Sequence, residues 1–182
     1  MALDSRLLEQ VLNAPESRDV LASPIVTAII LGDPAHAADL ALALEASGSR
    51  RAHNARRILC QFGAEAVPHL LGAAATGSAA TAQDAIEILW AMLIGEDRST
   101  IRKVLDRASD DLDRLLQDKR PLPDIDASSI ERDFVGRVCD LTYCVLRQLD
   151  DPEHDRSLFR SLDDDARDTE IGAYRGRFLA VG

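Results

Sequence analysis

Apolar residues recur every three or four positions along most of the chain, which is the spacing of one face of an α-helix. The clearest run lies between residues 49 and 62, and its apolar members are Ala52, Ala55, Leu59 and Phe62. Arginines occupy the opposite face of this run. The pattern therefore predicts an amphipathic helix with a buried stripe of small and aliphatic residues and a basic outer face.

Helix boundaries follow from the glycine, proline and acidic residues around this run. We expect Gly63 to end the helix in the left-handed conformation, which satisfies the last carbonyl groups. A second helix begins at once, because Glu65 suits the positive end of a helix and Pro68 suits its first turn. A third helix, from about Ala82, repeats the apolar pattern.

The apolar runs recur with a regular period. Gly32, Gly63 and Gly95 lie at intervals of 31 and 32 residues, and each follows an apolar run and precedes an acidic residue. A period near thirty residues is typical of one helix-turn-helix unit of a repeat protein. Because helices with a single apolar stripe bury it by stacking, we expect an all-α fold, an α-α superhelix of about five antiparallel helix pairs.

Before residue 49 the pattern predicts further helices. Residues 4–13 carry one apolar stripe. Residues 24–31 are rich in β-branched side chains, which suit a strand, but a lone strand among helices would leave its edges unpaired. We therefore expect a buried helix there. Asp33 and Pro34, a cap and a first-turn proline, are expected to open a helix that runs through Ala46.

After the third helix the pattern is interrupted once. Helices are expected from about residue 99 and from Asp110, and an irregular loop at about residues 119–127 contains two prolines. Ser128 and Glu131 have the spacing of a capping box, which predicts the start of the longest helix, ending at Asp150. The acidic run at residues 163–165 is expected to begin the last helix.

One segment carries a resemblance to a known family. The run Gly63-Ala-Glu-Ala-Val-Pro-His-Leu-Leu-Gly72 resembles the HEAT-like repeat of the phycobilisome-lyase type. Residues 137–142 and 167–175 look like the last unit of bacterial HEAT-repeat proteins. The resemblance covers residues 49–95 best, extends to 20–48 and 128–179, and is absent from 110–127. It implies a HEAT-like solenoid, a fold that serves adaptors, inhibitors, lyases and nucleic-acid enzymes alike.

Composition and charge narrow the class of protein. The 182 residues fit a single domain, 1–182, and 46% hydrophobic with only 4% aromatic residues suits packed helices. A net charge of −10 disfavours a nucleic-acid partner and an anionic membrane surface. The N-terminal residues contain no apolar core of signal-peptide length, and no run approaches the ~20 apolar residues of a membrane span. Its three cysteines have no zinc-type spacing, so we expect reduced thiols and a cytoplasmic location.

The most distinctive local charge is a group of four arginines, since no acidic residue lies between Gly48 and Phe62. Guanidinium groups in this arrangement suit an acidic protein surface, a phosphate or a nucleic-acid backbone. The alternative is a solvated helix face that pairs with acids on adjacent repeats. The candidate partner-binding residues are Arg50, Arg51, Arg56 and Arg57.

The remaining candidates for chemistry indicate structural roles. Residues 150–155 hold several possible metal ligands but lack the spacing of a calcium loop or a zinc site, so they predict a polar turn. The four histidines fall in four separate segments and suggest no catalytic pair. Trp90 adjoins the apolar stripe of the third helix and is expected in the core. We expect no cofactor, no metal and no catalytic residue.

These observations favour a non-enzymatic module that binds another protein, as an adaptor, a scaffold or an inhibitor of the immunity type. Stacked repeats present an extended surface for such binding, and the acidic charge would steer a basic partner. Two alternatives stay open. One, from the family resemblance, is a chaperone-like bilin lyase that acts on a partner protein. The other is a HEAT-like DNA-repair glycosylase, which the acidic charge disfavours.

Overall fold

The computed structural model describes residues 5–15, 19–45, 48–123 and 136–179, and of residues 178 and 179 it describes the backbone alone. The described part is all-α, which confirms the expected class, and its only β-type pairing is an isolated bridge between Pro121 and Arg137. The α-helices are α1 (Ser5–Leu12), α2 (Pro24–Ile30), α3 (His36–Ala41), α4 (Arg50–Leu59), α5 (Val67–Thr76), α6 (Ala79–Leu93), α7 (Arg98–Arg107), α8 (Ser109–Leu115), α9 (Val138–Asp150), α10 (Arg156–Arg160) and α11 (Asp164–Leu179). Short 3₁₀ helices occupy Val20–Ala22 (η1), Leu42–Glu45 (η2) and Ala64–Ala66 (η3).

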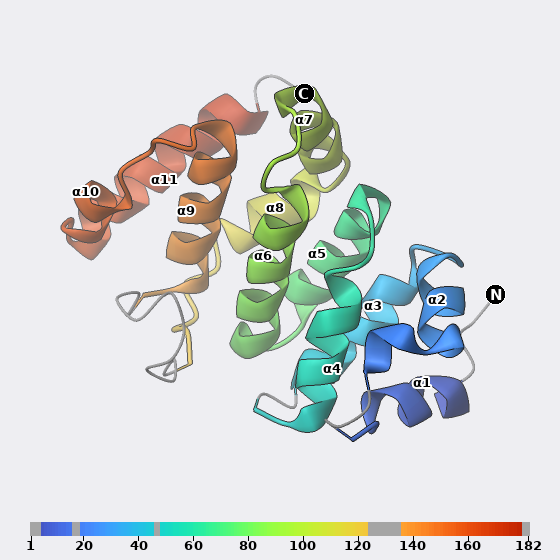
Figure 1. The fold of residues 1–182 in the computed structure, drawn as a ribbon. Coiled ribbons are helices and arrows are strands. Elements are labelled where there is room, and N and C mark those ends of the chain that lie inside the picture. The colour runs from blue at the N-terminus through green and yellow to red at the C-terminus, as the bar shows by residue number, and fades with distance from the viewer. Residues whose placement is uncertain (1–4, 16–18, 46–47, 124–135, 180–182) are drawn as a thin grey trace.

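The helices pack against neighbours one to three helices away along the chain. Figure 1 shows α4, α6 and α9 following one another across the molecule, and α6 contacts both of the others. A second row is formed by α3, α5 and α8, with α5 in contact with both neighbours. Contacts between α5 and α6 join the two rows, and α11 packs on α9 at one end.

One contiguous cluster of buried apolar side chains extends from Val11 in α1 to Tyr174 in α11. Of the stripe expected on the basic helix, Ala55, Leu59 and Phe62 belong to this cluster, and Ala52 is buried as well. Small side chains at such positions allow helix axes to approach closely. The predicted periodicity therefore describes the core-facing side of α4 correctly.

A buried polar side chain of α4 holds the end of α1 through hydrogen bonds. The amide nitrogen of Asn54 in α4 donates to the carbonyl oxygens of Leu12 at 3.0 Å and Ala14 at 3.1 Å. One carbonyl belongs to the last residue of α1 and the other lies two residues beyond it, where a helix has no N–H groups of its own to pair with them. Asn54 thus satisfies the end of α1 and fixes it on α4.

The segment with β-branched residues forms the helix α2, as expected, with Pro24 in its first turn. Other boundaries differ from the prediction. Helix α3 begins at His36 and not at Pro34, because the Asp33 carboxylate accepts the Ala35 N–H at 3.0 Å and closes a turn first. It gives way to η2 after Ala41, and Ala46 lies outside the described residues.

Gly63 does not adopt the left-handed conformation that we expected. Its φ is −78°, because α4 already ends at Leu59 and a tight turn follows. In that turn the Phe62 N–H donates to the Leu59 carbonyl at 3.0 Å, so the last carbonyls are satisfied without a left-handed residue. Among the described residues, positive φ occurs at Gly48 (74°) and Gly95 (91°).

The expectation of a longest helix through residues 128–150 is wrong in the part that the structure describes. Ser128 and Glu131 lie outside the described residues, and α9 begins only at Val138. The Leu122 N–H donates to the Gly136 carbonyl, and the Val138 N–H donates to the Arg120 carbonyl. These two hydrogen bonds pair residues 136–138 with residues 120–122 in an extended arrangement directly before α9. With 13 residues, α9 is shorter than α6 with 15 and α11 with 16.

Candidate functional site

An apolar groove lies where the C-terminal ends of α6 and α9 meet the start of α7. Its volume is about 260 Å³. Small-molecule sites in proteins usually enclose roughly 300–1,000 Å³, so this groove suits one or two amino-acid side chains better than a cofactor. The lining residues are Trp90, Leu93, Ile94, Gly95, Glu96, Arg98, Ile101, Gln148, Leu149 and Pro152.

The turn after α6 creates the exposed part of the groove. The apolar run of α6 continues through Leu93, which is fully buried, to Ile94, which leaves the helical conformation (ψ 124°) and is 55% exposed. Gly95 then reverses the chain with a φ of 91°. Because such a φ is costly for residues with a Cβ, glycine is needed for this tight connection. The turn therefore holds an isoleucine side chain at the surface.

Neighbouring helices supply the floor and walls. The Asp97 carboxylate accepts the N–H groups of Ser99 and Thr100 and so caps α7 directly after the turn. Because α7 begins at this point, the buried side chain of Ile101 lines the groove, and the side chain of Leu149 lines it from the last turn of α9. Trp90 is partly buried against the core and also lines the groove, so it has more exposure than we expected for a core residue.

Charged residues lie on the rim of the groove and next to it in the chain. Glu96 and Arg98 line it, both are exposed, and neither forms an ion pair with another described residue. Hydrogen bonds from Thr100 hold the pKa of Asp97 below its usual value, so that carboxyl stays ionised. Asp151 and Glu153, both exposed, flank Pro152 in the chain. One carboxylate, that of Glu96, and one guanidinium group, that of Arg98, therefore line the groove, and three further exposed carboxylates lie beside lining residues in the chain.

The four arginines predicted as a partner-binding group are mostly engaged within the protein. Arg51 pairs with Glu9 of α1, and Arg57 with Asp19 at 3.0 Å. Arg56 pairs with two acids of α6, Asp84 at 2.9 Å and Glu87. Arg50 is exposed and makes no ion pair with a described residue. This pairing matches the alternative of a solvated face joined to acids on neighbouring helices.

A second groove of about 260 Å³ lies between α8, α9 and α11. Its charged groups are paired inside the protein: Lys119 with Asp168, and Arg175 with Asp113 at 2.7 Å. Burial raises the pKa of the Cys139 thiol in its wall to about 12. The thiol is therefore protonated near neutral pH and is a poor nucleophile. These contacts give the second groove a structural role.

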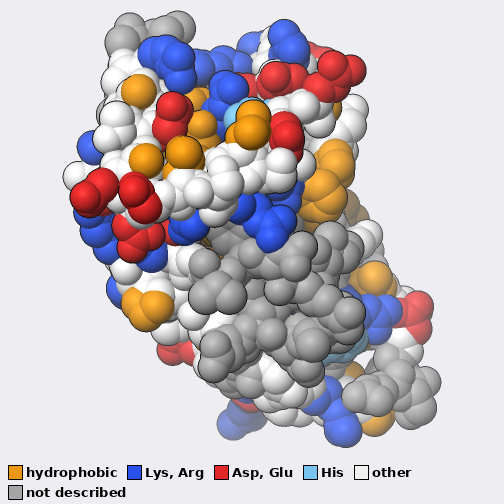
Figure 2. All heavy atoms as spheres, turned by 90° about the vertical axis from the view of Figure 1, so that its left-hand side faces the viewer, with side chains coloured by type: hydrophobic (Ala, Val, Ile, Leu, Met, Phe, Trp, Pro, Cys, Tyr) orange, Lys and Arg blue, Asp and Glu red, His pale blue; other side chains and the backbone are white. Residues whose placement is uncertain are grey.

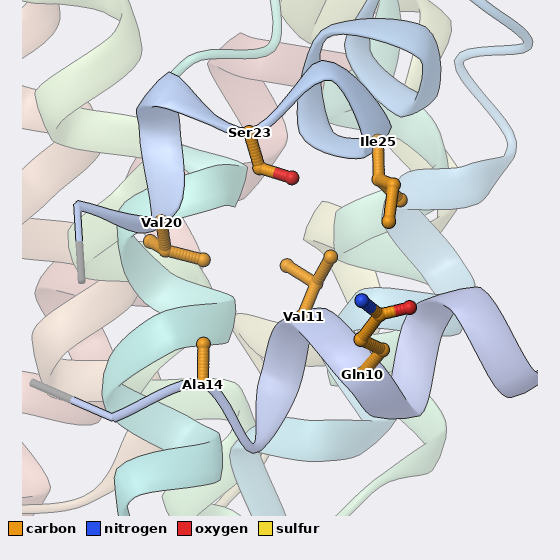
Figure 3. A pocket seen from close by; sticks show the side chains of 6 residues that line it. All are labelled: Gln10, Val11, Ala14, Val20, Ser23 and Ile25. Atoms are coloured by element: carbon orange, nitrogen blue, oxygen red, sulfur yellow. The ribbon is translucent and has the colours of Figure 1, made fainter.

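A third, much smaller cavity of about 10 Å³ separates α1 from the start of α2. Figure 3 shows the side chains of Val11 and Ala14 facing those of Val20 and Ile25 across it, with Ser23 beside them. This volume holds about one water molecule. We therefore assign it to packing.

Figure 2 shows the surface on the side of α10 and α11. On the coloured part of this face acidic and basic side chains are intermixed, and hydrophobic ones occur in small groups. This mixture is typical of a solvated face with local ion pairs and lacks the single-signed field that steers a nucleic acid.

The polar turn at residues 150–155 uses its carboxylates for structure, as expected. Asp155 accepts the Ser157 N–H at 2.8 Å and caps α10, and Asp150 accepts the Tyr174 hydroxyl at 2.7 Å. Among the described residues, no three His, Cys, Asp or Glu side chains are placed to hold a metal ion. His36, His53, His69 and His154 belong to four different segments.

His154 has the most specific environment of the four histidines. Its Nδ1 lies 3.5 Å from a guanidinium nitrogen of Arg147, and its ring meets Tyr143 edge-on with centroids 6.3 Å apart. Burial, together with the charges of Arg147 and Arg156, lowers the pKa of His154, while Asp151 and Asp155 oppose the shift. The folded protein therefore favours a neutral imidazole.

This environment predicts a pH-dependent contribution to stability. As the pH falls below about 6.5, the unfolded chain takes up a proton on His154 before the folded chain does, so stability declines. The variant His154→Asn keeps an acceptor near Arg147 and cannot titrate. Urea unfolding at pH 7.5 and pH 5.5 should show a smaller loss for the variant than for the wild type. Equal losses would contradict this assignment.

The first groove, lined by Trp90, Ile94, Ile101 and Leu149 and called the Trp90 groove from here on, was not predicted from the sequence, although two signals point to it. An isoleucine directly before a turn glycine and a lone tryptophan one helical turn earlier both stand out in the run 88–95.

Within the described residues, the helices are all too short or too polar to cross a membrane. Comparisons with protein-family models, with curated proteins and with solved structures found no match to this chain.

Proposed function

We propose that this protein is a non-enzymatic interaction module that binds a partner protein through the Trp90 groove. The observation that carries the proposal is the groove itself: a 55% exposed Ile94 and a partly buried Trp90 over a floor of Ile101 and Leu149. Tryptophan in a desolvated pocket is the residue type most often found at energetic centres of protein interfaces.

Covering the apolar surface of this groove would stabilise a complex with a partner. Burying apolar surface is worth about 25 cal/mol per Å², and a rigid aromatic ring loses little conformational entropy on binding. Ile94 is held at the surface by the Gly95 turn and not by packing of its own. An apolar side chain from a partner would complete its contacts.

The arrangement of the helices supports a proposal about the architecture on which the groove lies. Two rows of helices, α4-α6-α9 and α3-α5-α8, are what successive helix pairs of an α-α solenoid would produce. We therefore propose a HEAT-like solenoid as the architecture, in line with the resemblance of residues 63–72. In such a stack the helix ends and turns form an edge, and the Trp90 groove lies on it.

The two alternative functions find less support. A bilin lyase would need a groove for a tetrapyrrole, and the described grooves are smaller than the usual range for small-molecule sites. A DNA glycosylase would need a basic face, and three of the four clustered arginines pair with acids of the same chain. We therefore retain protein binding as the proposed function.

The test compares proteins captured from the native lysate by three forms of the chain. Ile94→Asp places a charge in the groove, and Leu158→Asp places one at another exposed leucine, 69% exposed on α10. We expect a partner that wild type and Leu158→Asp retain and that Ile94→Asp binds at least about fivefold more weakly, the effect of losing about 1 kcal/mol of binding free energy. Circular dichroism and urea unfolding check that the three forms fold equally.

A fourth form, in which Arg50, Arg51, Arg56 and Arg57 are replaced by glutamate, separates the two faces. If the partner is lost from this form alone, it binds the arginine face and the groove proposal fails. Equal capture by all four forms would place the binding site on another surface.

A further inference from the structure

The structure also indicates what kind of segment would occupy the Trp90 groove. We propose that the groove binds a partner segment in which a bulky apolar side chain is adjacent to a lysine or arginine. This inference rests on the proposed function and adds the chemistry of the partner. Its two parts come from the lining of the groove and from the charges on its rim.

The lining favours one bulky apolar side chain. Leu93, Ile101 and Leu149 are nearly fully buried and leave no polar atom of their own side chains at the floor. A polar side chain placed there would lose its hydration without gaining a hydrogen-bond partner from these residues. The volume of about 260 Å³ accommodates a leucine, methionine or phenylalanine side chain.

The rim favours a cation beside that anchor. Glu96 lines the groove, is exposed and makes no ion pair with a described residue, so its carboxylate is available to a partner. Asp97, Asp151 and Glu153 add exposed carboxylates next to lining residues in the chain. The cations in the same position are engaged inside the protein, Arg102 with Asp106 and Arg147 beside His154 and the Tyr174 ring. Arg98 is the guanidinium group that lines the groove itself. Charges of opposite sign across an interface favour association and penalise an acidic competitor.

The charge of the whole chain acts in the same direction. A net charge of −10 attracts a basic segment over a distance that salt limits to roughly 10 Å. Binding of such a segment is therefore expected to weaken as the salt concentration rises. Binding through the apolar contacts alone would change little with salt.

A selection from a library of random twelve-residue peptides displayed on phage tests this inference. The wild-type chain, Ile94→Asp, Glu96→Lys and the matched control Glu45→Lys are used as four baits. Glu45 is exposed on η2 and, like Glu96, forms no ion pair with a described residue. We expect wild type and Glu45→Lys to enrich peptides that carry an apolar residue next to lysine or arginine.

Each outcome decides a different point. Synthetic copies of the enriched peptides should quench or shift Trp90 fluorescence and bind Glu96→Lys about fivefold more weakly than wild type, the effect of one charge contact. Enrichment of apolar peptides without a basic neighbour, or with an acidic one, overturns this inference and leaves the proposed function intact. Enrichment no greater on wild type than on Ile94→Asp overturns both.

Discussion

Replacement of Asp140 by asparagine is expected to lower the free energy of unfolding by about 3 kcal/mol, the effect of removing one partner from a buried ion pair. Asp140 is completely buried at the start of α9. Its carboxylate accepts two hydrogen bonds from the Arg137 side chain, at 2.9 and 3.1 Å, and one from the Arg137 N–H. Arg167 approaches it at 3.5 Å. An amide of the same size cannot neutralise the two guanidinium groups, which are only 14% and 18% exposed.

The matched control for this prediction lies in the same network. The Asp164 side chain is 72% exposed and meets Arg137 and Arg167 only at 4.0 and 3.8 Å. Asp164→Asn should therefore change the free energy of unfolding by less than about 1 kcal/mol, as is usual for exposed pairs. Urea unfolding followed by circular dichroism measures both variants. Equal losses of unfolding free energy in the two variants would mean that the burial of Asp140 does not make its ion pairs stronger than those of Asp164.

Replacement of Phe159 by alanine is expected to cost about 3–5 kcal/mol, the usual range for removing a buried aromatic ring. Phe159 is 4% exposed and stacks on Tyr143 of α9 with ring centroids 4.4 Å apart. The guanidinium group of Arg167 lies 5.9 Å from the centre of the same ring. Because α10 is only five residues long, it depends on this side chain for its attachment to α9 and α11.

Leu158, the preceding residue on α10, is the control for Phe159. It is 69% exposed, so Leu158→Ala should change stability by no more than about 0.5 kcal/mol. Thermal unfolding of the two variants side by side measures the contrast. A Phe159→Ala variant as stable as Leu158→Ala would show that the aromatic cluster does not hold the C-terminal helices together.

The sequence predicted the helices where periodicity and caps agree. The run 49–62 forms α4 with the expected buried stripe, Pro24 opens α2, and α11 begins within the acidic residues 163–165. Prediction failed where backbone contacts between distant segments decide the outcome. The extended pairing of Arg120 with Val138 joins residues far apart in the chain, so local spacing could not place the start of α9 at Val138.

The candidate site was harder to predict than the fold, for two physical reasons. The arginines stood out because like charges cluster in the sequence, but their partners Glu9, Asp19 and Glu87 are 31 or more residues away. A sequence pattern cannot show that such charges are already paired. The Trp90 groove, in contrast, is assembled from the ends of three helices, and only their packing brings Ile94 and Leu149 together.

The ion pairs within the chain also bear on the choice of function. Pairs such as the buried Arg137–Asp140 and the partly exposed Arg56–Asp84 each occupy one cation and one carboxylate, and because the chain has 31 acidic against 21 basic residues, carboxylates remain in excess. A protein with this surface and a small apolar groove is suited to a partner that brings both an apolar anchor and positive charge. The excess of acidic over basic residues thus leaves carboxylates unpaired after the ion pairs inside the chain have formed, and the proposed interface uses these carboxylates.

Photo-crosslinking tests the central claim, that a partner protein binds in the Trp90 groove, most directly. A photoreactive amino acid is placed at Ile94 in one form and at Leu158 in another, and both are irradiated in the native lysate. We expect a crosslinked protein from the Ile94 position that is missing from the Leu158 position and reduced when unlabelled wild-type chain competes. Crosslinks of equal yield from both positions, or none from Ile94, would contradict the claim.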